Sequence, residues 1–227
     1  MDFGDTYGLL ILIAFVVIAV VSIVVSLYSA AQRRNALMQL CATHGWTFSV
    51  SDRIGLTCWN GFSCLCAGYS QRAYNIMQGQ YGNVRFCAFD YRYTTGSGKS
   101  RQTHHFSAVM IELQYPIKKI LIRPEGFGDR LAGMLGFEDI DFEWEEFNRA
   151  FYVKAEDKAA AYDVISQKMM EYLMLNRGWH IEISGRYMIV HNGVLDPDGF
   201  LKAMGFCDGF LKQLPGYLAE KMRSQGQ

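Results

Sequence analysis

An uncharged apolar segment near the start constrains this chain more than any other feature. Residues 6–32 contain no Asp, Glu, Lys or Arg, and positions 9–21 are thirteen consecutive apolar residues. Because a helix rises about 1.5 Å per residue, about 20 such residues cross a hydrocarbon core about 30 Å thick. The segment therefore predicts a transmembrane helix that contacts the lipid bilayer through residues 8–28.

A cleavable signal peptide is the alternative interpretation of this segment, since Ser29-Ala30-Ala31 resembles a small-residue cleavage site. The basic region that opens a signal peptide is missing, and the apolar stretch exceeds the usual length of about 7–15 residues. Both points favour a retained helix. We therefore divide the chain into a transmembrane anchor at residues 1–32 and a domain at residues 33–227.

The charges beside the apolar segment predict its orientation. Asp2 and Asp5 precede it, whereas Arg33 and Arg34 follow it directly. Basic residues are enriched on the cytoplasmic side of membrane helices. We therefore expect a single-pass protein of the inner (plasma) membrane, with its N-terminus outside and its C-terminal domain in the cytoplasm.

The remaining composition excludes several classes of partner. The chain has 22 basic and 22 acidic residues, so no strongly basic surface for nucleic acid is expected. Its six cysteines lack the paired CxxC spacing of a zinc site, and in a cytoplasmic domain they are expected to be reduced core residues. No cofactor is predicted.

The stretch TTGSGKS at residues 94–100 resembles the end of a phosphate-binding loop. Such a loop needs a first glycine at position 93, which is Tyr93 here, and a helix after its Lys-Ser pair. Residues 101–111 are instead rich in Thr, Val, Ile and Phe, as in a strand. The stretch is therefore predicted to be the tip of a β-hairpin.

The chain after the anchor predicts an α+β fold, with one N-terminal transmembrane helix followed by an antiparallel-sheet domain with packing helices. Short turns between successive strand-like runs favour a meander. The expected strands are 46–50, 62–69, 73–80, 84–93, 101–113, 118–123, 149–153 and a hairpin of 180–184 with 187–191. The expected helices are 33–44, 129–135, 156–175 and one that starts after Asp196 and ends near Pro215.

The second hairpin carries the best-defined candidate metal site. With Gly185-Arg186 as its two-residue turn, His180 faces His191, and Glu182 shares their side of the ribbon. Two imidazoles and a carboxylate are ligands for zinc or iron. The alternative is that these histidines are ordinary surface residues. No nucleophile motif is present, so catalytic residues are unknown.

Six of the nine residues from 138 to 146 are acidic. In an extended chain, Ile140, Phe142 and Trp144 would form an apolar face opposite the carboxylates. A divalent-cation site is one interpretation, although the spacing does not match an EF-hand loop. The favoured interpretation is a solvated surface, or one paired with basic residues elsewhere in the chain (Lys118, Lys119, Arg123 or Arg130). We expect a protein partner to bind at this surface through Asp139, Asp141, Glu143 and Glu145.

Three segments are similar to a domain of unknown function in uncharacterised bacterial membrane-anchored proteins, which is found beside LemA-type membrane proteins. They are residues 89–94 (FDYRYT), residues 146–153 (EFNRAFYV) and the helix at 161–173. The resemblance covers about residues 84–195. It implies a membrane-anchored class and carries no activity over to any residue.

The favoured function is a non-catalytic module, tethered to the membrane, that binds another protein. One alternative is a metal-dependent hydrolase that uses His180, Glu182 and His191. Another is a lipid-binding domain similar to a pleckstrin-homology barrel, because a meander followed by a helix is typical of that fold.

The anchor makes a direct prediction. Val17→Arg places a charge at the centre of the apolar segment and should cost about 2.5–3.5 kcal/mol of insertion free energy. The variant should be retained less well in membrane fractions than the parent chain. A C-terminal reporter active only outside the cytoplasm would contradict the orientation, and a mature N-terminus near Ala31 would contradict the anchor.

Overall fold

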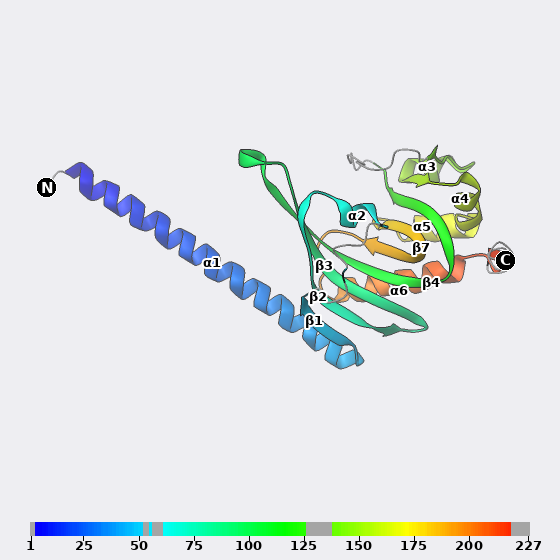
Figure 1. Cartoon of the computed structure of the whole chain (residues 1–227), viewed down its shortest axis with the longest axis horizontal. Helices are drawn as coiled ribbons and strands as arrows, with labels where there is room; N and C mark the ends of the chain where they lie inside the picture. The colour runs from blue at the N-terminus through cyan, green and yellow to red at the C-terminus, as the bar shows by residue number, and fades with distance from the viewer. Residues whose placement is uncertain (1–2, 52–54, 56–60, 126–137, 219–227) are drawn as a thin grey trace.

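The structure, a computed structural model, describes residues 3–51, 55, 61–125 and 138–218. Its longest element is helix α1 (Phe3–His44), which extends away from the rest of the molecule (Figure 1). The helix has 42 residues and a length of about 63 Å at 1.5 Å per residue. Its most apolar window is long enough to cross a membrane, and none of that window is buried against the rest of the chain.

Helix α1 continues without a break past residue 32 and ends where the sequence predicts. Gly45 has φ +69°, and the Trp46 N–H donates to the Cys41 carbonyl at 2.9 Å. Glycine adopts this left-handed conformation without a Cβ penalty, and such a bond closes the last turn of many helices. The apolar segment and the start of the domain therefore share one helix, and the side chains of Leu37 and Cys41 near its end are buried in the domain core.

In the described part of the chain, seven strands form one antiparallel sheet, which confirms the α+β class. Their order is β1-β2-β3-β4-β6-β5, and β7 pairs with β4. The strands are β1 (Thr47–Ser51), β2 (Tyr69–Tyr81), β3 (Val84–Thr95), β4 (Gln102–Pro124), β5 (Glu138–Asp139), β6 (Phe151–Ala155) and β7 (His180–His191).

Strand β4 is one long curved strand (Figure 1), whereas the sequence predicted two strands, 101–113 and 118–123. The prediction is wrong because the expected turn at Tyr115-Pro116 is only an irregularity. The pairing with β7 shifts between Glu112 and Ile117 and then continues. Pairing with β7 on both sides of this bend keeps the backbone extended through it.

Strand β7 reverses its direction within its 12 residues. The ring centroids of His180 and His191 are 4.9 Å apart, whereas eleven extended residues would span about 36 Å. Gly185 has φ +59°, as the first position of the predicted two-residue turn requires. The arm after Gly185 pairs with β4 residues 108–112, and the arm before it pairs with residues 120–122.

The helices depart from the predictions at several places. Residues 62–69 were predicted as a strand but contain a short helix, because the Glu182 carboxylate accepts hydrogen bonds from backbone N–H groups at its start. The helix predicted at 156–175 is interrupted at Ile165, because Ser166 caps the next helix through Met169 N. The helices after α1 are α2 (Ser63–Cys66), α3 (Glu145–Ala150), α4 (Lys158–Val164), α5 (Gln167–Leu175) and α6 (Pro197–Gln213).

Other helix predictions have clear outcomes. Helix α6 begins with the Asp196 cap, whose carboxylate accepts from Gly199 N at 2.6 Å, and it ends before Pro215, as expected. The helix predicted at 129–135 lies outside the described residues. The acidic stretch was expected to be extended throughout, but from Glu145 it forms α3.

The sheet buries side chains on both faces. The larger hydrophobic cluster contains Ala88 and Val109, together with the buried residues of α1 and α6. The second cluster contains Phe89 and Met110, on the opposite face, with Leu65 of α2. Because successive strand residues point to opposite faces, the two clusters use alternate residues of the same strands.

The stretch TTGSGKS forms the tip of the β3–β4 hairpin, which confirms its prediction. Thr95 pairs with Gln102, and a single 3-10 turn, η2 (Gly98–Ser100), lies between the strands. A strand, not a helix, follows Ser100. The geometry needed to bind phosphate at a helix N-terminus is therefore missing at this stretch.

Candidate functional site

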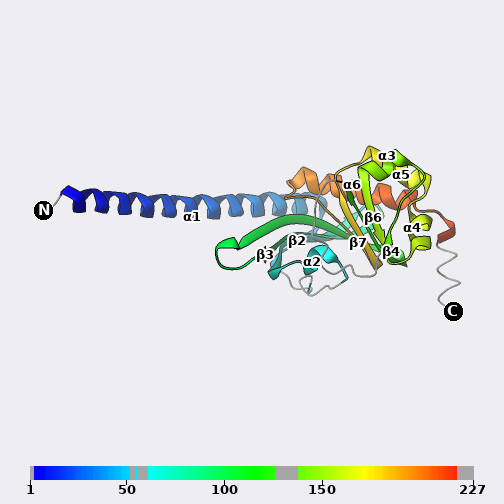
Figure 2. The same ribbon diagram turned by 90° about the horizontal axis from the view of Figure 1, so that it is seen from above.

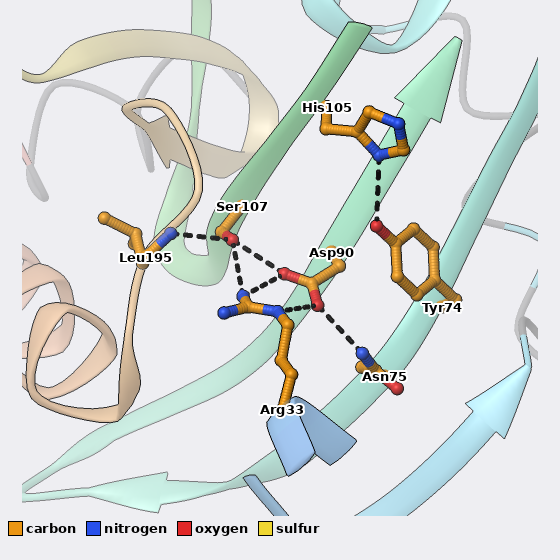
Figure 3. A network of polar contacts seen from close by, with 7 residues as sticks. All are labelled: Arg33, Tyr74, Asn75, Asp90, His105, Ser107 and Leu195. Atoms are coloured by element: carbon orange, nitrogen blue, oxygen red, sulfur yellow. Dashed lines mark hydrogen bonds and ion pairs between the residues drawn. The ribbon is translucent and has the colours of Figure 1, made fainter. Parts of the chain in front are cut away.

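A polar network joins α1 to the sheet just after the apolar segment (Figure 3). The Arg33 guanidinium donates from Nε and Nη2 to the two carboxylate oxygens of Asp90, at 2.8 and 2.6 Å. The Asp90 side chain is only 2% exposed, and that of Arg33 is 24% exposed. A two-bond ion pair of this kind defines both the position and the rotation of the helix.

The remaining polar atoms of the network are also satisfied. Asn75 Nδ2 donates to Asp90 at 2.9 Å, and Ser107 Oγ donates to the same carboxylate at 2.7 Å. Ser107 Oγ in turn accepts from Leu195 N, the residue before the α6 cap, at 3.0 Å. Helix α1, three strands and the start of α6 therefore converge on one buried carboxylate.

Asn75 shows that the backbone is shaped for this contact. It has φ +50°, which is unusual for a residue other than glycine, and it lies in an irregularity of the β2–β3 pairing between Tyr74 and Met77. A bulge of this kind redirects a side chain from its regular position. Here the amide of Asn75 points toward Asp90 (Figure 3).

A second cluster lies where β7 meets α2. The Cys64 sulfur, a Glu182 carboxylate oxygen and a His191 ring nitrogen lie within 4.8 Å of one another. Of the predicted metal residues, Glu182 and His191 are thus brought together, and the His180 ring stacks on that of His191. Cys64 was missed, because residues 54–69 carry no periodicity that would place it.

The protonation of this cluster does not favour nucleophilic chemistry. Burial raises the pKa of the Cys64 thiol, and the neighbouring Glu182 raises it further. Burial, with a smaller effect of His180, lowers the pKa of His191 to about 3. The thiol and the imidazole are therefore both held neutral. A reactive cysteine instead needs a lowered pKa and a partner that is protonated or accepts its proton.

Glu182 has a structural role in this cluster. Its carboxylate accepts from Ser63 N at 2.6 Å, Ser63 Oγ at 2.8 Å and Cys64 N at 3.0 Å, and the residue is 1% exposed. These bonds attach the start of α2 to β7. The same donor set of sulfur, carboxylate and imidazole also suits zinc, so the predicted metal site remains a prediction, now with Cys64 as its third candidate ligand.

The acidic segment has the alternation that the sequence predicted up to residue 144. Ile140 and Phe142 are buried, whereas Asp139, Asp141 and Glu143 are exposed. The four candidate partner-binding carboxylates fall into two groups, those with a contact inside the domain and those without an ion pair to a described residue. Asp139 contacts Lys154 and Tyr152, and Glu145 contacts Arg149. Asp141 and Glu143 form no ion pair with the described residues.

The Asp139 contacts have an electrostatic effect. The Tyr152 hydroxyl and the Lys154 ammonium lower the pKa of the Asp139 carboxyl. Its charge is partly neutralised within the domain and is less available to a partner than those of Asp141 and Glu143. The predicted binding role of all four residues stays a prediction.

A surface hollow of about 440 Å³ lies elsewhere, along the edge strand β1 with Ile76 and Gln78 of β2. Its lining consists of apolar side chains, hydroxyl groups and the Gln78 amide, without carboxylate, imidazole or thiol. The hollow and the cluster of Cys64 therefore do not combine into one site.

Comparison with known proteins shows a similar fold and no family. No protein-family model matches the chain, and no curated protein matches it. The resemblance to the domain found beside LemA-type proteins therefore stays a prediction. A crystal structure of the mycobacterial trehalose monomycolate transport factor A, TtfA, is similar, with a TM-score of 0.59 and 12% identity over 81% of this chain and 96% of that chain. At this identity the similarity is one of fold.

The network at Asp90 predicts an asymmetry between two adjacent arginines. Arg33→Met leaves Asp90 buried without its cation and should cost about 3 kcal/mol of unfolding free energy. Arg34→Met, at an exposed position, should cost less than about 0.5 kcal/mol. Denaturant unfolding of the full chain in detergent, followed by circular dichroism, measures both. Equal losses in the two variants would contradict the role of the network.

Glu182 predicts a second stability difference. Glu182→Gln replaces one accepting oxygen by an NH2 group, which cannot accept from the backbone N–H groups of Ser63 and Cys64. The substitution should cost about 2–3 kcal/mol of unfolding free energy. Glu112→Gln, in an exposed ion pair with Arg186, should cost less than about 1 kcal/mol. We expect the Glu182→Gln loss to be the same with and without a chelator. Stoichiometric zinc in the purified chain, lost in Cys64→Ser and His191→Ala, would instead establish the metal site.

Proposed function

We propose that this chain is a non-catalytic protein-interaction module held beside a membrane. In this proposal α1 crosses the inner membrane of a bacterial cell once, with its N-terminus outside and the domain in the cytoplasm. The single observation that carries the proposal is the attachment of the domain to an apolar helix through Arg33 and Asp90. A domain on a loose linker would sample many orientations, whereas this one presents a defined surface to its neighbours in the membrane.

Tethering supports binding as the function. A domain confined beside the bilayer meets other membrane proteins at a high effective concentration, so a weak interface suffices. The neutral Cys64 and His191 also give no support to nucleophilic catalysis. The similar protein TtfA is a transport factor, and we propose that the partner of this chain is likewise a component of a membrane transport process.

The proposed contact surface is the acidic segment at β5 and the turn before α3. It lies at the end of the domain far from the N-terminal end of α1 (Figure 1). Asp141 and Glu143 supply the exposed charges, supported from below by buried Ile140 and Phe142. Binding through exposed carboxylates should weaken as salt rises, because the screening length falls to about 8 Å at physiological ionic strength and further above it.

The test is a pair of matched variants in the full chain. Asp141→Asn with Glu143→Gln should weaken co-purification of a membrane protein in mild detergent by about tenfold. Asp139→Asn with Glu145→Gln removes the same charge from internally paired positions and should have a smaller effect. Mass spectrometry identifies the partner, and circular dichroism controls for folding. Equal effects of the two pairs would contradict this surface, and a hydrolytic activity lost in His191→Ala would contradict the function.

The second candidate function is a metal-dependent hydrolase. It is favoured only by the convergence of Cys64, Glu182 and His191, and the chelator experiment on Glu182→Gln decides it.

A further inference from the structure

The outer part of the β3–β4 hairpin, nearest its tip, has a charge distribution unlike that of the whole chain. Residues 91–111 contain Arg92, Lys99 and Arg101 and no Asp or Glu, although acidic and basic residues are equal in number overall. All three basic side chains are exposed. None of them forms an ion pair with another residue in the part of the chain that the structure describes. The hairpin therefore presents uncompensated positive charge to its surroundings.

The hairpin also projects in a specific direction. In both Figure 1 and Figure 2 its tip extends out of the domain toward the side on which the N-terminal part of α1 lies. That part of α1 is the apolar segment that would cross the membrane. If α1 crosses a membrane, a domain attached at Arg33 would carry its basic hairpin on the side that faces the bilayer.

The tip is braced by contacts of its own. The Tyr69 hydroxyl donates to the Gly96 carbonyl at 3.0 Å, and Ser97 and Ser100 exchange hydrogen bonds across the tip. Behind them, the rings of Tyr93 and His104 stack with their centroids 4.8 Å apart. Lys99 therefore lies on a preformed turn and loses little backbone freedom when it meets a ligand.

The residues around the tip are those of a membrane interface. Tyr69 is 44% exposed beside the tip, and tyrosine is enriched where a membrane meets water. Apart from Lys99, the tip at residues 94–100 is made of the small residues Gly, Ser and Thr, which fit closely against a polar surface. Basic residues near an anionic leaflet each strengthen binding by about fivefold at physiological salt.

We propose that the tip of the β3–β4 hairpin is a second membrane contact, which binds the headgroup phosphates of anionic phospholipids on the surface from which α1 emerges. Lys99 and Arg101 supply the charge, and Tyr69 lies at the level of the headgroups. Together with α1 this contact holds the domain at two points, which restricts its tilt over the membrane. The inference is independent of the partner proposed for the acidic segment.

Hydrogen exchange of the full chain in nanodiscs tests the contact. The amides of residues 96–101 should exchange about tenfold more slowly in discs of phosphatidylcholine with phosphatidylglycerol than in phosphatidylcholine alone. High salt should remove the difference, because the attraction is electrostatic. Inorganic phosphate added to the neutral discs should give no protection, which separates a lipid surface from a free anion.

Two double variants complete the experiment. Lys99→Ala with Arg101→Ala should abolish the protection in anionic discs and leave the fold unchanged, since both side chains are exposed. Lys158→Ala with Lys168→Ala removes the same amount of charge from α4 and α5, and this variant should retain the protection in anionic discs. Equal exchange in the two lipid mixtures, or protection that persists without Lys99 and Arg101, would overturn the proposal. The experiment contains no protein partner, so its failure and that of the acidic surface are distinguishable.

Discussion

The ion pair between Arg33 and Asp90 is the contact on which the arrangement of this molecule depends. Arg33 is the first charged residue after 27 uncharged ones, and it lies where α1 leaves its apolar segment. Asp90 is buried in the middle of β3, and a buried carboxylate is stable only with a cation and hydrogen bonds around it. The end of the apolar segment and the attachment of the domain therefore coincide at one residue.

Because both occur at one residue, α1 holds the domain in a fixed orientation relative to the apolar segment. The helix remains continuous to His44, and its buried residues Leu37 and Cys41 pack into the same core as α6. A rotation of α1 about its axis would remove Arg33 from Asp90 and also these side chains from the core. The orientation of the domain is thus coupled to the orientation of the helix. The basic hairpin and the acidic segment lie at different ends of the domain, although the charges of the whole chain balance (Figure 1).

Local features of this fold could be read from the sequence. The end of α1 at Gly45, the hairpin tip at residues 94–100 and the Asp196 cap of α6 all depend on a few adjacent residues with strong backbone preferences. The alternation around Ile140 also follows from the neighbouring residues. Strand β4 was divided wrongly because Pro116 is typical of a turn, whereas pairing with both arms of β7 holds this strand together. At this position the hydrogen bonds between β4 and β7 outweigh the local preference of Pro116 for a turn.

The sequence by itself determined the apolar helix, the alternation of the strands and the reversal at Gly185, because each is a property of neighbouring residues in one element. Only the tertiary structure decided which of these elements share a site. Arg33 and Asp90 are 57 positions apart, and Cys64 and Glu182 are 118 apart. A periodic pattern shows which face of an element is buried, but not what lies against it. The partner of a buried charge is chosen when the sheet closes and water is excluded from the space around Asp90 and Glu182.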